Sequence, residues 1–322
     1  MKNIFNKKNL LSILFMVVLF GVVQFLIQEK IITSYMRTNI YWICIYIILG
    51  LSLNIIIGIT GQLSLGHAGF MSIGAFSAAV VLAKNPTMTG LFIGILVGIG
   101  ISLVVSFIVA VPTLRLKGDY LAIATLGVAE IIRIVLNNLT ITNGASGMSN
   151  IKMLMTWPLM FTFVVLAFIL TKNFKNSAVG RACISIKEDE IASEAMGINT
   201  TKYKVIAFMF GATLAAVAGA LYATTYYIVK PDTFGVNTSI NIVILVVFGG
   251  MGSLSGTVIA TIFIGYINML LQAYSEPRLI MYALILIVVM IFRPQGLMGS
   301  KELALKLLPK FDNPFKRKEK LS

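Results

Sequence analysis

Residues 40–83 read IYWICIYIILGLSLNIIIGITGQLSLGHAGFMSIGAFSAAVVLA, two long apolar runs joined by a segment rich in glycine and polar residues. Each run approaches the roughly 20 residues that an α-helix needs to cross a bilayer. Lipid cannot hydrogen-bond to the irregular backbone of the connecting segment, residues 58–69, so this backbone must lie inside protein or line a water-filled cavity. The stretch therefore predicts two membrane helices that meet at a non-helical break.

The rest of the chain repeats this pattern of long apolar runs. Of its 322 residues, 58% are hydrophobic and 12% are charged, and the mean hydropathy is +0.92, which excludes an ordinary soluble domain. We predict an all-α polytopic membrane domain over residues 1–300 and a basic cytoplasmic tail over residues 301–322. The ten runs of membrane-crossing length lie at about 10–27, 40–59, 67–83, 89–113, 119–136, 156–171, 205–226, 238–250, 256–273 and 279–292.

Basic residues are concentrated in the segments that share one side of the membrane when these spans are threaded in order. With the N-terminus inside, most of the 26 Lys and Arg residues lie in internal segments, as expected because positive loops stay in the cytoplasm. The net charge of +14 is therefore attributed to topology and contact with membrane lipid, with no nucleic-acid partner. We expect a multi-pass protein of the bacterial cell membrane with both termini in the cytoplasm.

A second glycine-rich interruption, residues 249–256, joins two apolar runs in the other half of the chain. Paired interruptions are typical of a transport pathway, and the alternative is two tight turns at the cytoplasmic surface. The apolar core before it, residues 240–248, is short for a full crossing and indicates a broken helix. The candidate pathway or gate residues, among which the histidine is equally compatible with helix packing, are Gln62, Ser64, His67, Gly249, Gly250 and Ser253.

The longest polar stretch predicted inside, residues 172–204, contains an amphipathic helical pattern. Ile184, Ile191 and Met196 fall near one another at helical spacing, with charged residues largely on the other faces, and Gly197 suits a helix stop. Such a helix is suited to docking a soluble cytoplasmic partner, and a solvated or interfacial loop helix is the alternative.

The remaining polar residues indicate no catalytic or metal site. Glu130 and Arg133 are three residues apart on one predicted helix and are interpreted as an ion pair near its outer end. Cys44 and Cys183 are predicted at opposite ends of the membrane, which argues against a disulfide, and with a single histidine they make no metal site. The chain has no phosphate-binding ATP motif and no cluster of acids and bases. We therefore expect a protein that is not an enzyme and carries no cofactor.

Several segments match a known family in detail. Over nearly the whole chain the sequence resembles LivM-type permease subunits of branched-chain amino acid ABC importers. The most specific segments are Gly61-Gln-Leu-Ser-Leu-Gly-His-Ala-Gly-Phe70, Leu116-Lys-Gly-Asp-Tyr-Leu-Ala-Ile-Ala-Thr-Leu-Gly127, Gly180-Arg-Ala-Cys-Ile-Ser-Ile-Lys-Glu-Asp-Glu190, Gly249-Gly-Met-Gly-Ser253 and Phe292-Arg-Pro-Gln-Gly-Leu297.

The resemblance implies a type II ABC membrane domain with about ten spans and a cytoplasmic coupling helix between the sixth and seventh. It implies a LivH-like second permease, two ATPase subunits similar to LivG and LivF that hydrolyse ATP, and an extracytoplasmic amino-acid-binding protein. Cys183-Ile-Ser-Ile departs from the alanine-rich pattern at that point, which bears on the ATPase contact. The residues that the resemblance assigns to ATPase coupling are Arg181, Glu188, Asp189, Glu190, Glu194 and Gly197.

Two other transport functions stay open. An ABC permease for urea or short amides would have a similar sequence, because specificity rests mainly on the binding protein. A stand-alone secondary transporter or channel would need intramembrane carboxylates, and only Glu130 and Asp119 qualify.

Overall fold

The computed structural model describes residues 20–114, 118–271 and 296–299, together with residues 18, 116, 284 and 287. The basic tail at 301–322, most of the first half of the span at 10–27 and, apart from residues 284 and 287, the predicted last span at 279–292 lie outside these residues. A helical stretch at 20–28 covers the end of that first span.

The described chain is built from helices and has no strand, only an isolated bridge between Met148 and Val229. The longer helices are α2 (Ser34–Asn54), α3 (His67–Lys84), α4 (Met88–Thr113), α5 (Asp119–Asn138), α6 (Trp157–Asn176), α7 (Ala178–Glu188), α8 (Glu190–Ala195), α9 (Thr200–Thr225), α10 (Val236–Gly249) and α11 (Leu254–Leu271). The short turns are the π-helical η1 (Ile55–Ile59), which continues α2, and the 3₁₀ turns η2 (Thr140–Thr142), η3 (Gly144–Ser146) and η4 (Pro231–Phe234).

Seven helices in the described residues are long and apolar enough to cross a membrane. They correspond to the predicted spans at 40–59, 67–83, 89–113, 156–171, 205–226, 238–250 and 256–273. The doubtful span at 238–250 corresponds to the 14-residue helix α10, which ends at the predicted interruption, at Gly249, and is preceded by η4. The predicted span at 119–136 forms α5, which is not among the seven and carries Asp119, Glu130 and Arg133. The total of ten spans stays a prediction.

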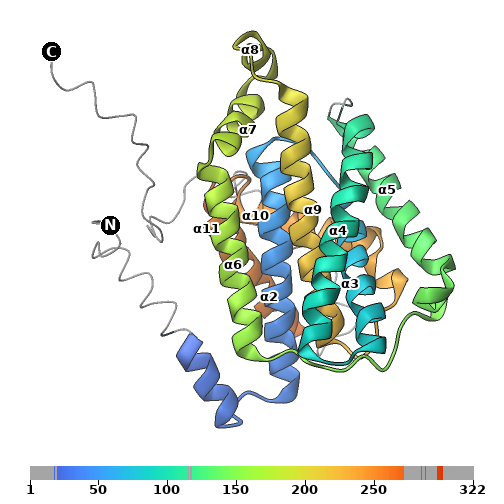
Figure 1. The fold of residues 1–322 in the computed structure, drawn as a ribbon. Coiled ribbons are helices and arrows are strands. Elements are labelled where there is room, and N and C mark those ends of the chain that lie inside the picture. Colours follow the sequence, from blue (N-terminus) through green and yellow to red (C-terminus); the bar gives the residue numbers. More distant parts are fainter. Residues whose placement is uncertain are drawn as a thin grey trace, which may run out of the picture.

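Helix α9 lies at the centre of the bundle, packed against α2, α3 and α4 (Figure 1). The contact with α3 depends on glycine. A Cβ on Gly74 would collide with the carbonyl oxygen of Ala216, and a Cβ on Gly219 would collide with that of Met71. Small residues on facing helices thus bring the helix backbones together.

The faces that the bundle leaves uncovered are apolar. On α4 the exposed side chains include Phe92, Leu96 and Ile108, and only a minor part of this span is buried inside the protein. Such a surface is unfavourable in water and favourable in lipid or against another apolar helix.

The connections separate into two ends of the bundle (Figure 1). Helices α7 and α8, the start of α9 and the connection from α4 to α5 lie at one end, which we call the coupling end. The start of α2, the connection from α3 to α4 and residues 139–156 lie at the other. Segments predicted to share a side of the membrane therefore do share an end.

Candidate functional site

The break after α2 is a buried, irregular segment. The helix widens into η1, a π-helical turn, and then ends, so that Thr60–Gly66 run without helical structure until α3 begins at His67. Gly61 takes a φ of +74°, which favours glycine. Thr60, Gln62 and Ser64 are buried, while Gly61 is exposed and lines a cavity with Gln62, so this segment lies partly inside the protein and partly along a cavity, the two settings predicted.

Asn54, which the sequence analysis did not single out, joins the two breaks. Its side chain is fully buried and donates to the carbonyl of Ser253 at 3.1 Å and to Thr257 Oγ1 at 2.6 Å. Its Oδ1 accepts from the backbone N–H of Gly252 at 2.8 Å. A Cβ on Gly58 would collide with Asn54 Oδ1 and Gly252 N. The two glycine-rich interruptions are therefore in direct contact, although about 190 residues separate them along the chain.

The second break is held by close packing and a helix cap. Gly249 is buried against α11, where a Cβ would lie 2.6 Å from Thr257 Cα, and Gly250 has a φ of +109°. Ser253 Oγ accepts from Gly256 N at 3.1 Å at the start of α11. The N–H of Leu297 donates to the carbonyl of Phe248 at 2.8 Å. These three candidate gate residues thus shape the turn between α10 and α11.

His67 is buried at the start of α3 and bonds to α2. Its Nε2 lies 2.6 Å from Ser52 Oγ, and Ser52 Oγ donates to the carbonyl of Leu49 at 2.7 Å. Because the single hydroxyl hydrogen is used on Leu49, Nε2 is the donor to Ser52, which leaves Nδ1 unprotonated in the neutral ring. This Nδ1 has no hydrogen-bond partner among the described residues. The bond from Nε2 to Ser52 agrees with a role of His67 in helix packing, whereas the buried Nδ1 is not explained by packing.

The loop before His67 is fixed by two neighbouring helices. Thr125 Oγ1 on α5 accepts from Leu65 N at 3.0 Å, and Ser239 Oγ on α10 accepts from Ala68 N at 3.2 Å. The second bond gives an acceptor to one of the N–H groups that have no partner within the helix at a helix N-terminus. The first break is therefore connected to both α5 and α10.

The predicted docking helix is in fact two helices that meet at Asp189. The Asp189 side chain caps α8 by accepting from Ala192 N at 3.0 Å, and Ser177 caps α7 in the same way. Gly197, with a φ of +84°, follows the end of α8, so the predicted helix stop is confirmed.

The predicted apolar face of this segment is confirmed for Ile184, which packs against the core, and is wrong for Ile191 and Met196. Cys183 and Ile186 form the buried face of α7, and Cys183 packs against Ile55 and Ile59 of η1. Ile191 and Met196 are 77% and 83% exposed, because the turn at Asp189 separates α8 from the face that α7 buries. The tip of the coupling end therefore presents apolar side chains outward.

Two lysines connect the coupling end to the two breaks. Lys187 Nζ on α7 donates to the carbonyl of Gly58 in η1 at 2.8 Å, and Lys175 Nζ at the end of α6 donates to the carbonyl of Gly252 at 2.6 Å. Ammonium groups stabilise the carbonyls left without partners where helices end or are interrupted. Both contacts are long-range in sequence, and the sequence analysis missed them.

The charged residues predicted for coupling divide into carboxylates that bond within the segment and side chains that are exposed to solvent. Glu190 Oε1 pairs with Lys204 Nζ at 2.6 Å, and Glu194 Oε1 accepts from Thr200 Oγ1 at 2.6 Å. Arg181 donates to the carbonyl of Asn176 at 2.8 Å and is exposed, as is Glu188. Three of the carboxylates thus hold the segment together, since Asp189 is the α8 cap.

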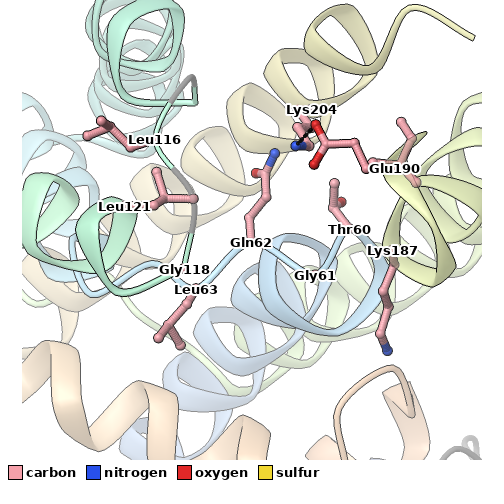
Figure 2. Close-up of a pocket in the computed structure, with 11 residues that line it drawn as sticks. Thr60, Gly61, Gln62, Leu63, Leu116, Gly118, Leu121, Lys187, Glu190 and Lys204 are labelled. Carbon is pink, nitrogen blue, oxygen red and sulfur yellow. Dashed lines mark hydrogen bonds and ion pairs between the residues drawn. The ribbon is translucent and has the colours of Figure 1, made fainter. Parts of the chain in front are cut away.

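Gln62 lines a cavity of about 270 Å³ at the coupling end (Figure 2). Its side chain is 4% exposed, and neither amide atom has a hydrogen-bond partner among the described residues. In Figure 2 the amide points toward the ion pair of Lys204 and Glu190. The cavity therefore brings a predicted gate residue, Gln62, together with a predicted coupling residue, Glu190.

At the opposite end, the predicted pair of Glu130 and Arg133 is confirmed at 2.8 Å. Arg133 also pairs with Asp232 of η4 at 2.8 Å, which the sequence did not indicate. Cys44 in α2 and Cys183 in α7 are free thiols, and both are buried. Burial raises the pKa of the Cys183 thiol above its ordinary value. Cys183 is therefore a poor site for thiol reagents.

Comparison with known proteins finds one family over most of the chain. Residues 35–293 match the family described as branched-chain amino acid transport system / permease component. The chain is 33% identical over 298 residues to the high-affinity branched-chain amino acid transport system permease protein LivM of Salmonella typhimurium, covering 82% of this chain and 70% of the relative. LivM of Escherichia coli is 32% identical with the same coverage.

Weaker similarities concern a shorter region and a solved structure. The permease protein LivH of Salmonella typhimurium is 33% identical over 135 residues, which cover 41% of this chain and 44% of LivH. A chain of PsaBC from Streptococcus pneumoniae in complex with Fab has a TM-score of 0.44 and 12% identity, covering 83% of this chain and 95% of that chain. This TM-score marks only a loose overall resemblance.

Proposed function

This chain belongs to the permease-component family of branched-chain amino acid transport systems, and from that membership we propose that it is one membrane subunit of an ATP-driven importer for leucine, isoleucine and valine. It is a multi-pass protein of the bacterial inner membrane. The coupling end faces the cytoplasm, in agreement with the distribution of basic residues.

One observation supports this function above the others: the coupling end is bonded to both glycine-rich breaks. Lys187 holds the carbonyl of Gly58, and Lys175 holds that of Gly252. Asn54 holds the two breaks against each other. A displacement of α7 is therefore transmitted directly to the two irregular segments, which are the parts of a membrane domain that can line a pathway.

Transport then follows by alternating access. ATP binding closes the ATPase subunits, and the displacement of α7 and α8 changes the arrangement of the breaks, so that the pathway closes on one side and opens on the other. Gln62, Ser64 and His67 are the residues of the first break that we assign to the pathway. The turn at Gly249, Gly250 and Ser253 acts as the second element of the gate.

The partners follow from chemistry and from the relatives. Helix α8 offers Ile191 and Met196, with Arg181 and Glu188 exposed on α7 nearby in sequence, which is a suitable surface for an ATPase similar to LivG or LivF. The uncovered apolar face of α4 fits lipid or a LivH-like second permease. The end that carries residues 139–156 receives the binding protein.

The test is to replace Met196 with glutamate in the assembled importer. A buried carboxylate in an apolar contact costs free energy, so we expect the ATPases to be lost on purification of the membrane subunits and leucine uptake into proteoliposomes to fall at least about tenfold. Met153→Glu is the matched control, because Met153 is a 61% exposed methionine at the other end of the bundle. It should retain the ATPases.

Three outcomes would contradict the proposal. If Met196→Glu retains both the ATPases and uptake, α8 is not the docking surface. If this chain alone takes up leucine without ATP, or if the complete importer takes up urea and not leucine, the assignment to an ATP-driven amino-acid importer is wrong.

A further inference from the structure

The cavity at the coupling end contains a buried amide that nothing in the described protein satisfies. Gln62 has both a donor and an acceptor buried without a partner. A buried polar group without a partner destabilises the folded protein, because it has lost its hydrogen bonds to water and gained none in return. A glutamine retained at that cost, with its amide directed into a cavity (Figure 2), is expected to bind something that enters the cavity.

The polar groups around the cavity present both signs of charge. Lys204 Nζ and the Glu190 carboxylate lie 2.6 Å apart at one side of the cavity, facing the Gln62 amide. An ammonium has three N–H donors and a carboxylate has several acceptor positions. After they bond to each other, Lys204 can still donate and Glu190 can still accept further hydrogen bonds. Together with the Gln62 amide, they match a ligand that carries a carboxylate and an ammonium on the same small molecule.

The remaining lining includes Thr60, Lys187, whose ammonium is bound to the carbonyl of Gly58, and several aliphatic side chains. Leu63 follows Gln62 in the break, Leu121 comes from α5 and Ile186 from α7. The volume of about 270 Å³ lies just below the range of roughly 300–1,000 Å³ for pockets that hold drug-sized ligands. It therefore suits a molecule with a short branched aliphatic group.

We propose that this cavity is a binding site for a free aliphatic α-amino acid at the cytoplasmic face, separate from the binding protein. The α-carboxylate is bound by Lys204 Nζ and Gln62 Nε2, the α-ammonium by Glu190 and Gln62 Oε1, and the side chain by Leu63, Leu121 and Ile186. The placement at the cytoplasmic face rests on the proposed function. Because the site joins the first break to α8 and α9, its occupant contacts gate and coupling elements at once.

The test is equilibrium binding of radiolabelled leucine to the purified importer without ATP and without the binding protein. We expect saturable binding that Gln62→Leu weakens by about tenfold to a hundredfold, the effect of losing hydrogen bonds to charged groups. Lys204→Met and Glu190→Gln should weaken it as well. Lys202→Met is the matched control, since Lys202 is exposed two residues earlier on α9, and it should bind leucine as the wild type does.

Analogues test the recognition of both charges. 4-Methylpentanoate lacks only the ammonium of leucine, and 3-methylbutylamine lacks only the carboxylate. We expect neither to compete with leucine at concentrations where valine and isoleucine do. Competition by either analogue at the concentration of leucine itself would overturn the proposed double recognition.

Two further measurements are the melting temperature of Gln62→Leu and the side of the membrane from which leucine binds. Because Gln62→Leu replaces an unsatisfied amide with an apolar group, the ligand-free variant should keep or raise its melting temperature, while leucine no longer raises it. A lower melting temperature would show a structural role and overturn the proposal. Sealed inside-out vesicles should bind leucine without ATP, and right-side-out vesicles should not; the reverse would overturn the cytoplasmic placement.

Leucine uptake with the binding protein and ATP is measured in the same preparations, so the two proposals are tested separately. If uptake is normal but wild-type importer shows no saturable binding, or if Gln62→Leu binds normally, the site is wrong and the importer assignment stands. If leucine binds as described but uptake is absent, only the proposed function is refuted.

Discussion

Asn54→Leu is the substitution that should most damage the junction between the two glycine-rich breaks. Asn54 makes three buried hydrogen bonds to the second break, with Ser253 O, Thr257 Oγ1 and Gly252 N. Leucine is similar in size but replaces none of them. The carbonyl of Ser253 still accepts from Thr257 N and Thr257 Oγ1, so the main new defect is the N–H of Gly252.

The magnitude follows from these bonds. Side-chain hydrogen bonds in membrane proteins average about 0.6 kcal/mol each, and a buried N–H left without a partner costs about 1–3 kcal/mol. Two lost bonds and one unsatisfied N–H together should lower the free energy of unfolding by about 2–4 kcal/mol. A loss of that size is a large fraction of the stability of an ordinary domain.

The measurement is thermal unfolding of the purified protein in detergent, together with leucine uptake. Asn39→Leu is the matched control, because Asn39 lies on the same helix and its side chain donates only to the carbonyl of Tyr35, at an exposed position. It should change stability by no more than about 0.5 kcal/mol. The variants Asn54→Leu and Thr257→Val should be non-additive, since they remove the same bond. Equal stability of Asn54→Leu and Asn39→Leu would refute the reasoning.

Two further predictions concern the coupling end. Lys187→Met removes the bond to the carbonyl of Gly58, so leucine uptake should fall about tenfold while the ATPases still copurify; uptake equal to that of Lys202→Met would show that the bond transmits nothing. Cys183 is fully buried and has a raised pKa, so it should resist an impermeant thiol reagent at neutral pH and react faster as pH rises, since the thiolate is the nucleophile. Met196→Cys should instead react at neutral pH in inside-out vesicles from which the ATPases have been removed, and not in sealed cells. Labelling of Met196→Cys from outside would place the coupling end on the wrong side of the membrane.

Local patterns predicted much of what the structure contains. The apolar runs predicted seven of the spans, because span length is set by the thickness of the bilayer. Glu130 and Arg133 were predicted as a pair because residues three apart on a helix are neighbours. Gly197 was predicted as a helix stop because it tolerates a positive φ.

The boundary between α7 and α8 was missed, because the helical periodicity of residues 177–197 hid the capping signal of Asp189. Helical periodicity across residues 177–197 placed Ile184 and Ile191 on one face. The side chain of Asp189 ends that periodicity by capping a new helix, and the buried face is instead that of Cys183 and Ile186. Aspartate is a preferred N-cap residue, so Asp189 was the signal that could have revealed the start of a second helix.

By itself, the sequence determined a helical membrane domain of the permease family, the position of its two glycine-rich interruptions and the position of the long polar segment for which we propose coupling. These follow from composition, period and backbone preference, which act over a few residues. Only the tertiary structure decided that Asn54 and the lysines 175 and 187 bind the two breaks, and that Gln62 shares a cavity with Glu190 and Lys204. Such contacts join residues up to about 200 positions apart, and they depend on how whole helices pack, which no local pattern encodes.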